Sequence, residues 1–176
     1  MRLSSLTLGL VLCAALLPGQ TKRRAPGFSL PSSADRQEDL ADYRGRIVLI
    51  DVMKTDCEHC GPFARILQQV AVRYGNKVAV LSIAPAPDNP AAVARFIAQN
   101  KITFPILYDC GQVVYSYVRP NPLNPAISLP HLYIVDRDGF IIRDYLFGAD
   151  TEEIFRGQDL FVELDRLLAP PHPKQK

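Results

Sequence analysis

The chain has 176 residues, with 20 basic and 18 acidic side chains and a formal net charge of +2. This length suits one globular domain plus a short targeting segment, and a hydrophobic content of 48% is enough for an ordinary core. The near balance of charge gives no electrostatic reason to expect nucleic acid or a strongly acidic molecule as a partner.

The first twenty residues have the features of a secretory signal peptide. Arg2 supplies a positive charge, and residues 6–17 form an apolar stretch that is too short and too poorly flanked for a membrane span. Cys13 invites a lipoprotein interpretation, but the bulky Leu12 stands where a lipid-attachment signal needs a small residue. We therefore expect an exported protein, periplasmic or secreted, that touches the membrane only through an uncleaved signal.

Residues 21–27 resemble a flexible linker in composition, and we expect the folded domain to span residues 28–168. Residues 47–53 and 78–84 are continuous apolar runs, which is typical of strands covered on both faces. The segment between them has helical periodicity and ends at Gly75, a suitable C-cap. Strand, helix and strand in this order predict a right-handed parallel crossover.

The second half of the domain predicts further helices and a hairpin. Shorter elements are expected at 91–100 (helix), 105–108 (extended) and 112–118 (helix). Residues 130–135 and 140–147 have the pattern of strands joined by an Asp-Arg-Asp-Gly turn, a hairpin signal. A last helix is expected from Thr151 to about residue 168, followed by a disordered Pro-rich tail at 169–176. Parallel strands followed by an antiparallel hairpin predict an α/β fold, with a central mixed sheet and helices on both faces.

A Cys-Glu-His-Cys run lies where the first apolar strand gives way to the helix. Two thiols separated by two residues can close into a disulfide at the first turn of a helix, and the helix N-terminus favours a thiolate there. We expect Cys57 to be the nucleophile and Cys60, one turn further in, to attack the mixed disulfide. The sequence holds no second Cys-x-x-Cys pair, so we expect no metal site, and no cofactor other than the redox-active Cys57–Cys60 disulfide.

Three neighbouring residues are candidates for adjusting this chemistry. A protonated His59 would stabilise a nearby thiolate, whereas Glu58 would oppose it; both can also be read as solvated residues of the helix start. Asp51 interrupts the buried strand, where desolvation would raise its pKa, so that it could take and return the proton of Cys60. The alternatives for Asp51 are a pairing with Lys54 or a position facing solvent.

Three candidates outside the dithiol loop also stand out. Leu129-Pro130, at a strand entrance after a long loop, is a candidate cis peptide bond that would expose the backbone of Leu129 to an extended substrate; the alternative is an ordinary trans proline. His131 could point towards the dithiol or be a satisfied surface or core residue. Cys110 can be read as a small buried hydrophobe or as a resolving or mixed-disulfide partner.

These motifs together resemble the thioredoxin superfamily, most closely the exported TlpA/ResA-type thiol–disulfide oxidoreductases. The similar stretches are Phe28–Pro31, Leu40–Gly45, Arg46–Cys60, Phe104–Asp109 and Leu129–Gly139. The resemblance implies a thioredoxin-like three-layer sandwich in which Cys57 is the exposed nucleophile, Cys60 resolves, Pro130 is the cis-proline and Asp51 is the buried acid. The chain departs from the family in having Val52–Asp56 instead of an aromatic-rich run before the first cysteine, and it contains no Trp.

We accordingly expect an enzyme, a monomeric thiol–disulfide oxidoreductase that reduces protein disulfides. Its partners would be protein thiol or disulfide substrates and a membrane-bound or soluble electron donor, and no nucleic acid. Three alternatives stay open: a DsbA-like oxidase or isomerase, a peroxiredoxin-like peroxidase, and a Sco-like copper-binding protein. The peroxidase site would need Thr where Lys54 stands, and the copper carriers space their cysteines by three residues instead of two.

Overall fold

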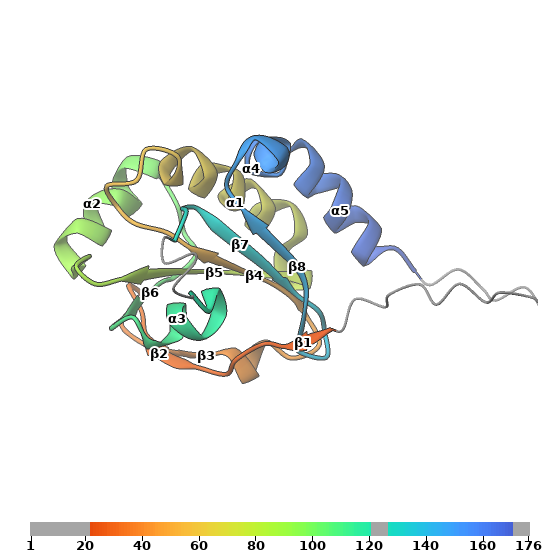
Figure 1. Cartoon of the computed structure of the whole chain (residues 1–176), viewed down its shortest axis with the longest axis horizontal. Helices are drawn as coiled ribbons and strands as arrows, with labels where there is room; N and C mark the ends of the chain where they lie inside the picture. The colour runs from red at the N-terminus through yellow and green to blue at the C-terminus, as the bar shows by residue number, and fades with distance from the viewer. Residues whose placement is uncertain (1–21, 121–126, 171–176) are drawn as a thin grey trace, which may run out of the picture.

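The computed structural model describes residues 22–120 and 127–170. Within these ranges one mixed sheet has the strand order β1-β8-β7-β4-β5-β6 (Figure 1). Its strands are β1 (Arg23–Arg24), β4 (Ile47–Val52), β5 (Val78–Pro85), β6 (Ile106–Asp109), β7 (His131–Val135) and β8 (Phe140–Leu146). The pairs β4–β5 and β5–β6 are parallel, while β4–β7, β7–β8 and β1–β8 are antiparallel. The predicted parallel crossover and the predicted hairpin are both confirmed.

Helices cover both faces of this sheet, so the predicted three layers are confirmed (Figure 1). One face carries α1 (Cys60–Tyr74), α2 (Pro90–Asn100), α4 (Glu152–Arg156) and α5 (Gln158–Leu168). The other face carries α3 (Gln112–Val118), the 3-10 turn η1 (Leu40–Tyr43) and a hairpin of β2 (Ser29–Pro31) and β3 (Gln37–Asp39). Two shorter 3-10 turns are η2 (Gly75–Lys77) and η3 (Ala149–Thr151). Among the described helices, none is long and apolar enough to cross a membrane.

The sequence pattern explains the two central elements. All six residues of β4 are buried, because helices or loops pack on both sides of it. Its odd-numbered residues Ile47 and Leu49 belong to the core beneath α1, while Val48 and Ile50 belong to the opposite core. In α1 the buried positions recur at helical spacing and include Phe63, Leu67 and Val70.

The segment expected to be a linker is part of the fold. Arg23 and Arg24 form β1 and pair with Ile141 and Phe140 at the edge of the sheet. The Arg23 guanidinium donates hydrogen bonds to the carbonyls of Ser116 and Tyr117, at the end of α3. The prediction was wrong because basic side chains suit an edge strand, where their stems cover apolar surface and their charged ends reach acceptors. The predicted signal peptide and residues 171–176 of the predicted tail lie outside the described residues.

The single last helix that was predicted is in fact two helices. Gly157 ends α4 and begins α5 with φ of 99°, in the left-handed region that favours glycine. A Cβ atom at this position would lie 2.9 Å from Cγ2 of Ile66 on α1. The bend therefore allows both short helices to pack closely against α1, and the helical pattern of the sequence hides it.

Candidate active site

The two cysteines of the predicted motif form a disulfide at the start of α1. Their Cα atoms are 5.3 Å apart. Cys60 is the first residue of the helix and is 1% exposed, whereas Cys57 lies in the preceding turn and is partly exposed. Backbone hydrogen bonds shape this turn, from Cys57 N–H to the carbonyl of Lys54 and from Cys60 N–H to the carbonyl of Cys57. A partner molecule can therefore reach the sulfur of Cys57 and not that of Cys60.

A carboxylate from the neighbouring loop holds the dithiol turn in place. The Thr55 N–H and hydroxyl donate to the two carboxylate oxygens of Asp88, at 2.8 and 2.5 Å. Asp88 lies between β5 and α2, so the turn before Cys57 is tied to the next parallel strand. Sequence reasoning missed this residue, because the Pro-rich run around it indicated only a turn.

The residue before the predicted cis-proline lies close to the outer sulfur. The Leu129–Pro130 peptide bond is cis, as predicted, and the carbonyl oxygen of Leu129 lies 3.7 Å from Sγ of Cys57. Pro130 is buried, and its own carbonyl accepts a hydrogen bond from the Phe147 N–H. The backbone next to Pro130 therefore borders the same surface as Cys57, a position suited to contact with a substrate chain.

Asp51 is buried in β4, with 2% of its surface exposed. Side chains alternate along a strand, so Asp51 faces the side of Leu49 and Met53, which is the side covered by α1. Its Oδ2 accepts a hydrogen bond of 2.8 Å from the Ser82 hydroxyl, and Oδ1 has no hydrogen-bond partner among the described residues. Burial raises the pKa of Asp51 to about 7, although the Ser82 hydrogen bond lowers it.

The alternative positions considered for Asp51 are not observed. It does not face solvent, and Lys54 instead pairs with Asp56, at 3.5 Å on the exposed rim of the site. An exposed ion pair of this kind contributes little to stability. A buried carboxyl whose proton is held near neutral pH is the type of group that can exchange a proton with a nearby thiol.

The two residues between the cysteines differ in their surroundings. Both Glu58 and His59 are exposed, but the His59 ring stacks on the ring of Phe147, with centroids 4.3 Å apart. His59 is therefore more than a solvated residue of the helix start. Phe147 was missed from the sequence, where it reads only as the last residue of a strand far from the cysteines.

His131 does not lie beside the dithiol. It stacks on Tyr133, on the sheet face opposite α1, and its Nε2 lies 2.6 Å from Oδ1 of Asp144. Cys110 is exposed, so the prediction of a small buried hydrophobe was wrong for this residue. It follows β6 directly and precedes α3, in the connection between the two elements, where its side chain is exposed.

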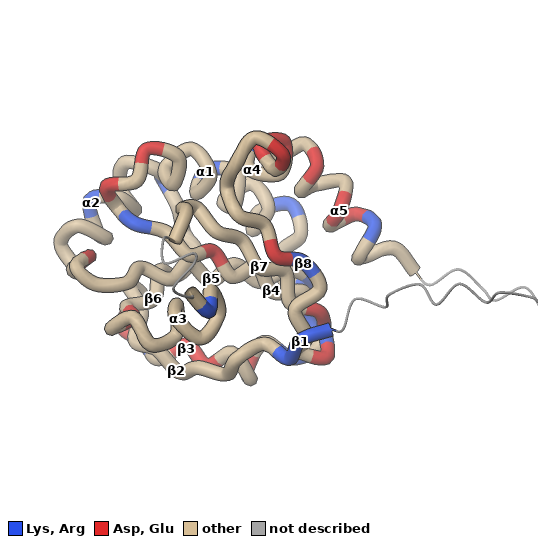
Figure 2. Tube along the Cα trace, in the orientation of Figure 1, with Lys and Arg blue, Asp and Glu red and all other residues tan. Residues whose placement is uncertain are grey.

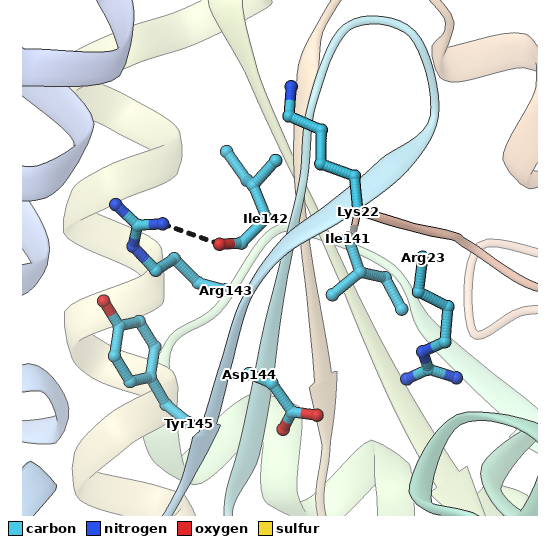
Figure 3. Close-up of a pocket in the computed structure, with 7 residues that line it drawn as sticks. All are labelled: Lys22, Arg23, Ile141, Ile142, Arg143, Asp144 and Tyr145. Carbon is cyan, nitrogen blue, oxygen red and sulfur yellow. Dashed lines mark hydrogen bonds between the residues drawn. The ribbon is translucent and has the colours of Figure 1, made fainter. Parts of the chain in front are cut away.

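Charged side chains are spread along the described residues, and a surface hollow lies outside the dithiol turn. Acidic and basic positions are interspersed along the trace (Figure 2). A hollow of about 780 Å³ is lined by residues of β8 and the β1 segment, with Arg143 donating to the carbonyl of Ile142 (Figure 3). None of these lining residues comes from the dithiol turn, and thiol–disulfide exchange needs an accessible sulfur more than a cavity. Across residues 22–120 and 127–170, no group of three or more His, Cys, Asp or Glu side chains is arranged to hold a metal ion.

Comparison with known sequences gives relatives over most of the chain. The thioredoxin-like protein YneN of Bacillus subtilis is 28% identical over 136 residues, covering 76% of this chain and 75% of YneN. The thiol-disulfide oxidoreductase ResA of Bacillus thuringiensis (strain Al Hakam) is 24% identical over 138 residues, covering 78% of this chain and 76% of ResA.

Solved structures with the same fold include proteins with similar names. The thioredoxin domain of a thiol-disulfide oxidoreductase from Bacteroides vulgatus has a TM-score of 0.65 and 17% identity, covering 81% of this chain and 96% of that one. A DsbF homologue from Corynebacterium diphtheriae has a TM-score of 0.69 and 21% identity, covering 83% of this chain and 87% of the homologue. These similarities confirm the thioredoxin-like fold. The AhpC/TSA family profile matches residues 21–143, well over half of the sequence, and the chain therefore belongs to the AhpC/TSA family of thioredoxin-like proteins.

Proposed function

We propose that this thiol–disulfide oxidoreductase is exported and reduces the disulfides of other proteins through Cys57 and Cys60. The observation that carries the proposal is the asymmetry of the pair: the outer sulfur is reachable beside the backbone of Leu129, and the inner sulfur is buried at the start of α1. An attacking sulfur must reach its substrate, and a resolving sulfur must be reserved for the mixed disulfide. The proposal invokes no metal or organic cofactor.

The proposed reaction starts from the reduced dithiol. The Cys57 thiolate attacks one sulfur of the substrate disulfide, forms a mixed disulfide and releases the other substrate sulfur, which takes up a proton. Cys60 then loses its proton and attacks the Cys57 sulfur, which releases the second substrate thiol and closes the Cys57–Cys60 disulfide. Two electrons pass from the enzyme to the substrate, and a donor dithiol returns them in the reverse exchange.

Asp51 is the proposed proton acceptor for Cys60. Its carboxyl faces the side of the sheet that α1 covers, and a pKa of about 7 makes it partly ionised at neutral pH. A group with a pKa near the working pH can both take and return a proton. Glu58 supports the reducing direction, since a negative charge near Cys57 disfavours the thiolate and hence favours the disulfide form of the enzyme.

Trapping tests the assigned sulfurs. A Cys60→Ala variant cannot resolve the mixed disulfide, so its Cys57 should accumulate covalent adducts with protein substrates that dithiothreitol releases. A Cys57→Ser, Cys60→Ala variant should accumulate none. Adducts that form equally well on Cys110 in the second variant would contradict the assignment of Cys57.

Direction and export need separate measurements. A reductase should have a reduction potential close to the −270 mV of thioredoxin, whereas a value close to the −120 mV of DsbA would favour the oxidase alternative.

Residues 1–20, with Arg2 and the apolar stretch behind it, support export. When residues 1–20 are fused to a phosphatase that is active only outside the cytoplasm, the fusion should show phosphatase activity in cells. Absence of phosphatase activity would remove the exported part of the proposal.

Two assays address the remaining alternatives. A peroxidase would consume hydroperoxide at a rate that Cys57→Ser abolishes, and a reductase would not. A copper carrier would bind copper(I) stoichiometrically and require a histidine, yet His131 lies on the sheet face opposite α1. Tight copper(I) binding that His131→Ala removes would therefore overturn the reductase assignment.

A further inference from the structure

We propose that Phe147 is a positioning residue for the dithiol: it holds the ring of His59, the residue before Cys60, so that the charge of this ring stabilises the reduced form. The inference rests on the proposed function and concerns its equilibrium: it assigns part of the reduction potential to a residue remote in sequence from the Cys-Glu-His-Cys motif.

The His59 side chain packs against the ring of Phe147. His59 precedes α1 as its N-cap, but its side chain makes no capping hydrogen bond. Its ring instead lies on the Phe147 ring, with centroids 4.3 Å apart and planes inclined by 24°. One face of the imidazole is therefore covered while the residue as a whole stays exposed.

The backbone of Phe147 is hydrogen-bonded to the cis-proline, Pro130. Its N–H donates a hydrogen bond of 3.2 Å to the carbonyl of Pro130. The preceding residue, Leu129, places its carbonyl oxygen 3.7 Å from Sγ of Cys57. Phe147 and the outer sulfur thus contact adjacent residues, Pro130 and Leu129, of one loop.

Two further rings hold Phe147 from behind. Phe147 packs edge-to-face on Phe155 of α4, with centroids 5.3 Å apart, and Phe155 packs in the same way on Phe63 of α1, at 4.8 Å. Phe155 and Phe63 are both buried. We call Phe63, Phe155 and Phe147 the aromatic column. It runs from Phe63 in the body of α1 to Phe147, on which the His59 ring stacks.

The expected effect of the column follows from charge. The face of a phenyl ring is negative and attracts a cation placed over it, so Phe147 holds a charged His59 ring in place at the start of α1. A cation near Cys57 stabilises its thiolate, which exists in the reduced protein and not in the disulfide. Phe147 should therefore shift the equilibrium towards the dithiol, opposing the effect of Glu58. The two rings are already stacked in the disulfide form, so only the attraction between the positioned imidazolium and the Cys57 thiolate differs between the oxidised and reduced forms. An exposed charge pair of this kind corresponds to a change of up to about fivefold, or about 20 mV, in this two-electron equilibrium.

The test is a double-mutant cycle on the thiol–disulfide equilibrium. The wild type, Phe147→Leu, His59→Gln and the double variant are equilibrated with glutathione redox buffers at pH 6, and the reduced fraction is measured by thiol labelling. Phe147→Leu should shift the equilibrium towards the disulfide by about twofold to fivefold, and Phe147→Tyr, which keeps the ring, should restore it. In the His59→Gln background, Phe147→Leu should cause no further shift.

Phe161→Leu is the matched control, because Phe161 is a partly buried ring that stacks on Tyr74 and is not part of the column. It should leave the equilibrium unchanged, and thermal melting of each variant shows whether the fold is kept. The inference is overturned if folded Phe147→Leu shifts nothing, shifts the equilibrium towards the dithiol, or has the same effect with and without His59. If the Cys57–Cys60 pair of the wild type fails to exchange with glutathione at all, the proposed function fails instead.

Discussion

Replacing Asp51 by Asn should change how the stability of the protein depends on pH. Asn keeps the shape of the side chain and still accepts the Ser82 hydrogen bond, but it cannot ionise. In the wild type, burial raises the pKa of Asp51 from 3.8 to about 7, so between these values the folded protein binds a proton that the unfolded chain has lost. The free energy of unfolding therefore decreases as pH rises through this range.

The magnitude follows from the two pKa values. The interval from 3.8 to about 7 covers about three pH units, and each corresponds to about 1.4 kcal/mol, giving about 4 kcal/mol in all. This contribution is fully present below pH 3.8 and is lost above about pH 7. The part of this interval above pH 5 covers about two pH units. From pH 5 to pH 8 the free energy of unfolding of the wild type should therefore decrease by about 3 kcal/mol relative to that of Asp51→Asn.

Guanidinium unfolding of the disulfide form at pH 5, 6, 7 and 8 measures this difference without interference from the two thiols. Any fixed cost of the buried amide cancels, because only the change of the difference with pH is compared. If the unfolding free energies of wild type and Asp51→Asn run parallel from pH 5 to pH 8, the carboxyl does not have a raised pKa. The proposed proton transfer from Cys60 would then lose its basis.

Three further substitutions test other parts of the structure. Ser82→Ala removes the hydroxyl that donates to the Asp51 carboxylate, so the pKa of Asp51, followed by carboxyl infrared absorption, should rise further; a fall would contradict the burial argument. Asp88→Ala removes both hydrogen bonds to Thr55 and should lower the free energy of unfolding by about 1 to 3 kcal/mol in urea titrations. Gly157→Ala places a Cβ in a left-handed position and should cost at least about 1 kcal/mol, whereas an unchanged melting temperature would refute the strain expected there.

The fold was accessible from the sequence where burial and periodicity agree. The apolar run of β4, the helical spacing of Phe63 and Leu67 in α1 and the turn before Gly139 each depend on local pattern, and these elements were predicted correctly. The edge strand at Arg23 was missed because its partner, β8, lies more than a hundred residues away. A strand of two charged residues has no local signature.

The site divides in the same way. The positions of Cys57, Cys60 and the cis Pro130 follow from motif spacing and from punctuation by proline. The contacts of Asp88 with the dithiol turn, and of Phe147 with His59, are made across the fold between residues with no pattern in common. Nothing in the sequence near either residue indicates these contacts, and only the assembled structure brings them together.

The aromatic column has a consequence for protein engineering. Its members Phe147 and Phe155 lie beyond residue 143, outside the region matched by the AhpC/TSA profile. Grafting the tetrapeptide Cys-Glu-His-Cys onto another scaffold would consequently transfer the reactive sulfurs without the ring on which the histidine rests. The reduction potential of such a chimera should be set by the residues of the new scaffold, unless the C-terminal phenylalanines are transplanted as well.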